Sequence, residues 1–234
     1  IVERGNEVRI PGGEFVLENG DMISVVASPL NASRFFRTIG IETNQVRNTM
    51  IIGGGKISFY LAKRLLEMGI QVKIVEKDRA ACERLCEQLP KAMIINGDGT
   101  DRDLLAEEGL ASAEGFAALT NMDEENVMLS LYAKSMSKAK KITKINRNTF
   151  DTIIGSLGIG SLIYPKHITS ETILQYVRAM QNSIGSNVET LYRLVDGNAE
   201  ALEFIIRGES EVTDIPLQEL DIKANTLVCA INRK

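Results

Sequence analysis

The chain has 234 residues, of which 44% are hydrophobic, 25% charged and 5% aromatic, a balance typical of a globular protein with a sizeable core. Its formal net charge is −4 and its basic residues are scattered among acidic ones, so nucleic-acid binding is not expected. No apolar run is long enough to span a bilayer and no signal-peptide pattern opens the sequence, so we expect no direct membrane insertion.

The first 29 residues alternate short apolar runs with glycine-containing turns, which predicts a small β-meander. We expect a short helix at 31–39, followed by a polar linker. The expected strands of the meander are 7–10, 14–17 and 22–27.

From Thr49 the pattern changes to alternating strands and helices. Apolar strands that alternate with helices of about ten residues are typical of βαβ crossovers, which cover both faces of a parallel sheet. The sequence therefore predicts a Rossmann-like, doubly wound α/β domain, followed by a helix at 169–181 and a strand-rich region. The expected strands are 49–52, 71–76, 92–96, 115–119, 141–145 and 162–164, and the helices are 57–68, 79–88, 101–108, 124–136 and 149–157.

A glycine turn joins the first of these strands to the first helix. Gly53 permits the tight turn, and Gly55 lets the backbone approach a pyrophosphate. The helix start at Lys56 and Ile57 supplies free N–H groups and the positive end of the helix dipole. Ser58 takes the third glycine position and is small enough for close packing of the helix on the sheet. The pattern predicts a dinucleotide site.

Glu76 ends the second strand about twenty residues after Gly55, where the dinucleotide motif requires an acid. Its carboxylate can accept hydrogen bonds from both ribose hydroxyls and would repel a 2′-phosphate, which favours NAD or NADH over NADP. The neighbouring Lys77 and Lys73 complicate this preference. The alternative interpretation is a glycine turn without a ligand and a solvated strand end.

A second loop follows the third strand, at an edge where strand ends of this fold converge on the cofactor. Asp98, followed by Gly99, is expected to meet the adenine side. Thr100 and Asp101 are explained as well by capping of the next helix as by binding.

A third loop follows the fourth strand and contains Thr120 and Asn121. These side chains can face the pyrophosphate or the nicotinamide ribose. The acids at 123–125 more often only stabilise the start of a helix.

No catalytic constellation accompanies these loops. The one histidine, His167, follows Pro165 at a helix start, and Cys82 and Cys86 have no second ligand pair nearby for a metal. We therefore expect no catalytic and no metal site. The dinucleotide is interpreted as an effector that shifts a conformational equilibrium, so the chain is not expected to be an enzyme.

These residues resemble the RCK, or KTN, regulatory domains of potassium transport, and specifically the TrkA type. The matching segments follow the family's order and spacing: 53–58, 75–78, 97–101, 119–126 and 157–165. The implied organisation is the end of a TrkA-C (RCK-C) module at 1–38, a linker at 39–47, an NAD-binding TrkA-N domain at 48–165, a crossover helix at 166–187 and the start of a second TrkA-C module at 188–234. The Rossmann-like domain would thus be flanked by strand-rich α+β half-modules.

The resemblance implies a cytoplasmic regulatory subunit that reaches the inner face of the membrane through a potassium transporter. It also implies a homo-oligomer, a dimer or higher, with NAD or NADH modulating gating. Lys56 and Lys144 match positions where the family is commonly basic, although lysine lacks arginine's bidentate geometry. The crossover helix would contact a partner subunit, packing on its own domain being the alternative. Its apolar face consists of Ile173, Leu174, Val177 and Met180.

Three alternatives stay open: an ATP- or ADP-sensing module, an NAD-dependent oxidoreductase fragment without its catalytic domain, and a module that senses another ligand such as a cyclic dinucleotide. The chain lacks an initiator Met and stops after an apolar, strand-like run, so we expect a piece of a longer protein. The two half-modules could then pair with each other within a chain or between chains, because unpaired strand edges are adhesive.

Overall fold

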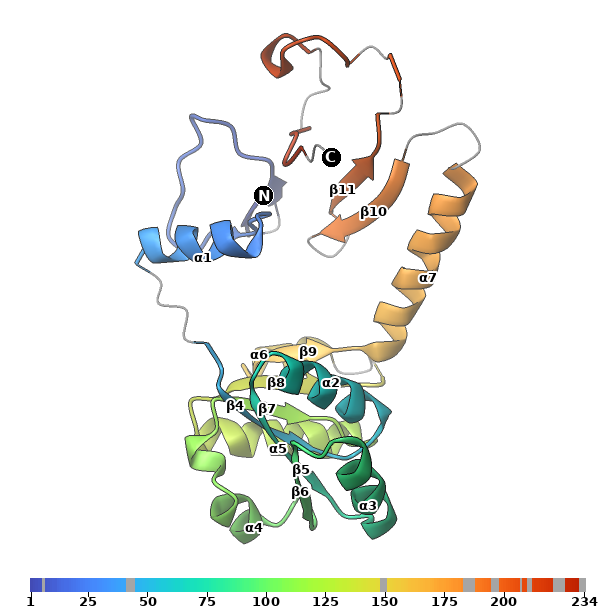
Figure 1. Cartoon of the computed structure of the whole chain (residues 1–234). Helices are drawn as coiled ribbons and strands as arrows, with labels where there is room; N and C mark the ends of the chain where they lie inside the picture. The colour runs from blue at the N-terminus through green and yellow to red at the C-terminus, as the bar shows by residue number, and fades with distance from the viewer. Residues whose placement is uncertain are drawn as a thin grey trace. The chain divides into compact units, whose positions relative to one another are not determined.

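The computed structural model describes residues 1–5, 7–40, 45–147, 151–182, 188–194, 198–206, 208–209, 212–220 and 226–231. The chain divides into two compact units, one made of residues 44–170 and the other of residues 1–43 together with 171–234 (Figure 1). No helix among the described residues is long and apolar enough to cross a membrane.

The unit at 44–170 contains a six-stranded sheet with the order β6-β5-β4-β7-β8-β9, and every neighbouring pair is parallel. The direction of the strand order reverses between β4 and β7, which confirms the predicted doubly wound, Rossmann-like sheet. The strands are β4 (Asn48–Ile52), β5 (Gln71–Glu76), β6 (Met93–Asn96), β7 (Gly115–Ala118), β8 (Lys140–Lys144) and β9 (Ser161–Ile163).

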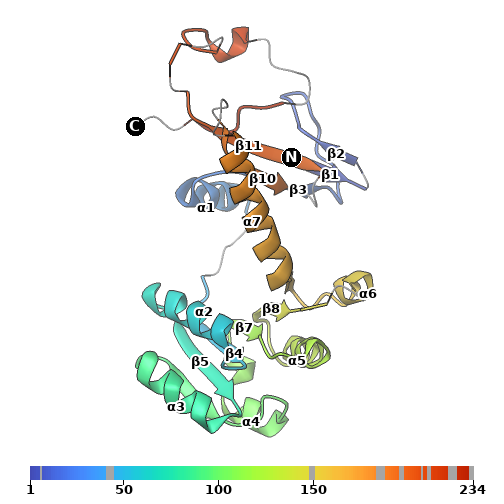
Figure 2. The same ribbon diagram turned by 90° about the vertical axis from the view of Figure 1, so that its right-hand side faces the viewer.

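Helices cover both faces of this sheet, as right-handed crossovers require. Figure 2 shows α2 and α3 on one side and α5 and α6 on the other. The helices are α2 (Lys56–Glu67), α3 (Arg79–Gln88), α4 (Arg102–Glu107), the 3-10 turn η1 (Leu110–Ser112), α5 (Asp123–Met136) and α6 (Asp151–Ser156). Residues 149–150 of the predicted fifth helix lie outside the described residues.

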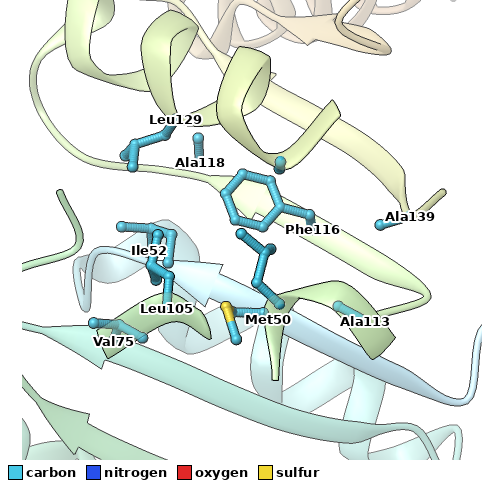
Figure 3. Close-up of a cluster of buried hydrophobic side chains, with 11 residues drawn as sticks. Met50, Ile52, Val75, Leu105, Ala113, Phe116, Ala118, Leu129 and Ala139 are labelled. Carbon is cyan, nitrogen blue, oxygen red and sulfur yellow. The ribbon is translucent and has the colours of Figure 1, made fainter. Parts of the chain in front are cut away.

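Strand β4 supplies side chains to two hydrophobic clusters, one on each face of the sheet. Met50 and Ile52 pack with Phe116 in the cluster beneath α4 and α5 (Figure 3). Ile51 points the other way and packs with Leu85 beneath α2 and α3. A strand buried on both faces reads as a continuous apolar run because neither side alternates with polar residues.

The first strands of the chain form a separate antiparallel sheet with the order β2-β1-β3. These strands are β1 (Val2–Arg4), β2 (Glu7–Arg9) and β3 (Met22–Ile23), and helix α1 (Pro29–Thr38) follows. The predicted strand at 14–17 is wrong. The guanidinium of Arg4 donates to the backbone oxygen of Val16 at 2.9 Å and to the Asp21 carboxylate at 2.7 and 2.8 Å. These hydrogen bonds hold residues 14–21 as a closed loop, and no strand forms at 14–17.

The last helix, α7 (Pro165–Asn182), begins four residues before the predicted Thr169, because proline fits the first turn of a helix. An antiparallel hairpin of β10 (Val188–Leu194) and β11 (Ala199–Phe204) follows, and then the 3-10 turn η4 (Leu217–Glu219). The described residues 226–231 form no strand, contrary to the apolar pattern.

Two expectations about the flanking regions stay predictions. In the described part of the chain, the β1–β3 sheet and the β10–β11 hairpin share no strand pair, so pairing of the two half-modules is not seen here. Ile173, Leu174 and Val177 of α7 are exposed, and their expected contact with a partner subunit is untested. Residues 41–44 of the predicted linker and 183–187 beyond α7 lie outside the described residues.

The Arg4–Asp21 pair predicts an acid-sensitive N-terminal sheet. The hydrogen bond from Arg4 lowers the pKa of Asp21 to about 2, with a further contribution from the backbone N–H of Glu18. Because the pKa in the folded state is the lower one, this stabilisation is present above the ordinary carboxyl pKa and is lost as the pH falls from about 4 to about 2. We expect the amide NMR signals of β1 and β3 to change across that interval.

The control is Asp21→Asn, which removes the titrating group at the same size. Its β1 and β3 signals should already be perturbed at neutral pH and should lack the change between about pH 4 and 2. Identical titrations of the two proteins would show that Asp21 does not hold this sheet.

Candidate functional site

The turn between β4 and α2 lies at the carboxyl edge of the sheet, against the loop that follows β7. Gly53 has a φ of +94°, a conformation that other residues rarely adopt. A Cβ on Gly53 would lie 3.1 Å from the backbone nitrogen of Thr120 and 3.2 Å from the backbone oxygen of Leu119. Glycine is therefore required both for the turn and for the close approach of the β7 loop.

Gly55 caps the start of α2 without any capping side chain. Its backbone is extended, and no atom lies within 4 Å of the position that a Cβ would take. Lys56 and Ile57, the first residues of the helix, are exposed beside this open space. A helix start with uncapped N–H groups and room beside it fits a phosphate group.

Ser58 is completely buried on the side of α2 that packs on the sheet. Its hydroxyl oxygen has no hydrogen-bond partner among the described residues. A buried hydroxyl without a partner costs roughly 1–3 kcal/mol, so the small size of Ser58, and not its polarity, suits this position.

Glu76, at the end of β5, turns its carboxylate toward the glycine turn. One oxygen accepts the N–H of Gly54 at 2.6 Å, and the other accepts the N–H of Asp78 at 2.7 Å. Lys77 is exposed beside it. Lys73 donates to the Glu108 carboxylate at 2.8 Å and to its backbone oxygen at 2.6 Å, so this lysine is already paired.

The loop after β6 is held by its own side chains. The Asp98 carboxylate accepts the N–H of Thr100 at 2.8 Å and its hydroxyl at 2.7 Å, and these bonds lower the pKa of Asp98. A Cβ on Gly99 would lie 2.2 Å from Ile52, so this glycine lets the loop pack on the end of β4. Asp101 caps α4 through the N–H groups of Asp103 and Leu104, as the capping alternative required.

Asn126 joins the loops after β7 and β8 by hydrogen bonds, a role that was not predicted from the sequence. Its completely buried side chain accepts the N–H of Thr120 at 2.9 Å and donates to the backbone oxygens of Thr120 and Lys144 at 3.1 and 2.9 Å. A polar residue on the buried face of α5, beside Leu129 and Ala133, is the signal that could have pointed to it.

Lys144 lies at the end of β8 and is only 5% exposed. Its ammonium group donates to the side-chain oxygen of Asn121 at 3.2 Å. Burial lowers the pKa of Lys144, while the nearby Asp123 acts in the opposite direction. A buried ammonium at the carboxyl edge of the sheet can stabilise an anion there.

Asp123 begins α5 and also fixes the loop after β8. Its carboxylate accepts the N–H of Asn146 at 2.9 Å, the side-chain amide of the same residue at 2.8 Å and the N–H of Arg147 at 3.0 Å. This acid therefore does more than stabilise a helix start.

Other reactive side chains lie away from this arrangement or are held by it. Cys82 is buried with its sulfur 3.2 Å from the backbone oxygen of Glu76, and burial raises the pKa of its thiol. Cys86 and Cys229 are exposed and form no disulfide, and His167 is exposed in the first turn of α7. Within the described ranges, no group of three His, Cys, Asp or Glu residues is placed to hold a metal.

The model of the TrkA-N domain family matches residues 49–165. This range covers half of the chain and includes the glycine turn, Glu76, Asn126 and Lys144. The chain belongs to the TrkA-N domain family. The family resemblance inferred from the sequence is therefore confirmed.

One curated relative is similar in sequence over this chain, and two solved structures share its fold. The Trk system potassium uptake protein TrkA of Vibrio alginolyticus is 32% identical over 240 residues, which cover 100% of this chain and 50% of that protein. The solved TrkA-N domain of the inner membrane protein ybaL from Escherichia coli has a TM-score of 0.51 at 15% identity, covering 58% of this chain and 99% of that one. The GsuK channel has a TM-score of 0.57 at 17% identity, covering 83% and 35%. The chain spans about half the length of the curated relatives it matches.

Removal of the Asn126 side chain should loosen the carboxyl edge of the sheet. Asn126→Ala leaves buried backbone groups of Thr120 and Lys144 without their partner, so we expect a loss of about 2–4 kcal/mol in the free energy of unfolding. Urea denaturation measures this loss. Met128→Ala, at an exposed position of the same helix, should change stability by about 0.5 kcal/mol or less, and equal losses in the two variants would contradict the role of Asn126.

Proposed function

We propose that residues 44–170 bind NAD or NADH at the carboxyl edge of the sheet and that this binding regulates a membrane potassium transporter. The observation that carries the proposal is the carboxylate of Glu76, held at the glycine turn by the N–H of Gly54 at 2.6 Å, beside the open space over Gly55. This pairs an acceptor for ribose hydroxyls with a helix start for a pyrophosphate.

The dinucleotide would contact residues from each of the loops at this edge. Gly53, Gly55, Lys56 and Ile57 would meet the pyrophosphate, with Ser58 packing the helix behind them. Glu76 would accept hydrogen bonds from the adenosine ribose. The remaining contacts would come from the loops and strand ends around it: Lys77, Asp98 and Gly99 on the adenine side, and Thr120, Asn121 and Lys144 on the other.

A regulatory role suits this set of groups better than catalysis. Both oxygens of Glu76 already accept backbone N–H groups, and Asp123 is occupied by Asn146 and Arg147. In this proposal the remaining acceptor sites of Glu76 would bind the ribose and Asp123 would hold the loop after β8, so neither acid would be left to act as a general base. When bound, the nicotinamide could supply hydride chemistry, but the chain would use the nucleotide as an effector.

The regulatory signal would travel through the side chains that join the loops. A ligand that contacts Thr120 would also affect Asn126, because the two are hydrogen-bonded. Lys144 is bonded in turn to both Asn126 and Asn121, so contact with Asn121 would affect Lys144. Asp123 extends the connection to Asn146 in the loop after β8. If the dinucleotide bound one arrangement of these loops more tightly than another, its binding would increase the population of the first arrangement at the expense of the second.

The potassium transporter is inferred from the names of the relatives, which are called Trk system potassium uptake protein TrkA. We propose that this chain, as part of a protein of that kind, works in the cytoplasm as a homo-oligomer docked on the inner face of the membrane through its transporter partner.

ATP or ADP is the second candidate ligand. Glu76 would accept the hydroxyls of any adenosine ribose, and the buried ammonium of Lys144 would favour additional negative charge at this edge. An NAD-dependent oxidoreductase is the third possibility, and it requires turnover of NADH with a carbonyl substrate.

Calorimetric titration of the protein with NAD, NADH, NADPH and ATP tests the proposal. We expect NAD or NADH to bind and NADPH to bind at least about ten-fold more weakly, because a 2′-phosphate would face the Glu76 carboxylate. Glu76→Ala should weaken NAD and NADH binding by a similar factor or more, and Glu107→Ala, at an exposed position on α4, should leave it unchanged.

Other outcomes decide between the candidates. Tightest binding of ATP would favour the second one, and absence of binding by all four nucleotides would contradict a nucleotide site in this unit. Loss of binding in Glu107→Ala as well would show that the effect of Glu76→Ala is not specific to the ribose.

A further inference from the structure

Gly54, the middle glycine of the turn, is packed more tightly than its neighbour Gly55. A Cβ on Gly54 would lie 2.7 Å from a methyl carbon of Leu85 and 3.0 and 3.1 Å from Cγ and Cβ of Glu76. The first distance is shorter than real Cβ contacts, and the other two require Glu76 to give way. Gly55, by contrast, has no atom within 4 Å of that position. Gly54 is therefore packed against other side chains, whereas Gly55 faces open space.

The partner of Gly54 is the side chain of Glu76. The stem of Glu76 and the methyl group of Leu85 share the space that a side chain at position 54 would fill, and the Glu76 carboxylate accepts the N–H of Gly54 at 2.6 Å. The N–H of Asp78 holds the other oxygen at 2.7 Å. Contact and hydrogen bond together fix the position of the carboxylate relative to the turn.

This arrangement leaves part of the carboxylate available. A carboxylate offers about four acceptor sites on its two oxygens, and the two backbone N–H groups use one on each. The remaining acceptors match two donors on neighbouring carbons, such as the 2′- and 3′-hydroxyls of a ribose. A 2′-phosphate has only acceptor oxygens and negative charge, so it cannot replace the hydroxyl.

We infer that Gly54 is a specificity-determining residue, which by lacking a side chain lets Glu76 hold its carboxylate against the turn and so select a ribose with a free 2′-hydroxyl over one with a 2′-phosphate. The inference rests on the proposed function. Gly54 acts through Glu76 and is in this sense a positioning residue.

The alternative is that Gly54 only makes room for Leu85. Leu85 is buried in the cluster beneath α2 and α3, so displacing its methyl group would disturb packing without any bearing on the ribose. The two roles differ in what they change. Loss of packing weakens binding of every nucleotide alike, whereas loss of the carboxylate's position changes the ratio between nucleotides.

The test is a calorimetric double-mutant cycle with NADH and NADPH as the ligands. Its variants are the wild type, Gly54→Ala, Glu76→Ala and the double variant. We expect Gly54→Ala to lower NADH affinity about ten-fold and NADPH affinity much less, so that the NADH-to-NADPH preference falls toward that of Glu76→Ala. In the Glu76→Ala background, Gly54→Ala should not change the preference further.

The matched control is Gly155→Ala in α6, where a Cβ would meet no atom within 4 Å, and it should leave both affinities unchanged. Thermal unfolding of each variant shows whether it is folded. If Gly54→Ala does not fold, the same cycle is run in a Leu85→Ala background, where the new methyl group has room on the α3 side and only Glu76 must move.

An equal loss of NADH and NADPH affinity in Gly54→Ala would overturn the inference, and so would an additive effect of the two substitutions on the preference. Either result leaves the proposed function standing, provided that the wild type binds NADH. If the wild-type protein binds neither dinucleotide, the proposed function fails and the inference fails with it.

Discussion

Burial of β4 on both faces is the constraint on which the rest of the 44–170 unit depends. Met50 and Ile52 face one hydrophobic cluster and Ile51 faces the other, so the strand cannot shift by one residue without exchanging the two sets. Its end is therefore fixed relative to β5 and β7. The chain must turn sharply between the end of β4 and the start of α2, and Gly53 provides the left-handed conformation that this turn requires.

Backbone groups, more than charged pairs, organise the edge that this turn creates. Glu76 is held by the N–H groups of Gly54 and Asp78, and Asn126 bonds the backbone of Thr120 and Lys144. Each of these bonds joins one side chain to a backbone group that the strand register fixes, so only one side chain has to be ordered for each bond. The loops at the carboxyl edge are thus positioned by the sheet itself. Binding sites are commonly built in this way, on loops that a rigid scaffold holds in place.

The sequence predicted what periodicity and local chemistry determine. The parallel sheet follows from apolar runs separated by helices, and the glycine turn from residues adjacent in the chain. The strand at 14–17 failed because Arg4 donates a hydrogen bond to Val16, 12 residues further along the chain, and no local pattern encodes such a contact. Gly54 was missed for the same reason, since only the fold brings Glu76 against it. Asn126 left a local signal, a polar residue on the buried face of α5, but its bond to Lys144 is made only by the fold. The binding roles of the predicted site residues stay predictions.

The contrast among the three thiols has a practical consequence for spectroscopy. Cys82 is buried against the backbone of Glu76 with a raised pKa, and thiols of this kind react slowly. Cys86 is exposed in one compact unit and Cys229 in the other. A donor and an acceptor dye would therefore attach to one native position in each unit, and energy transfer between them would report the separation of the units as nucleotide is added.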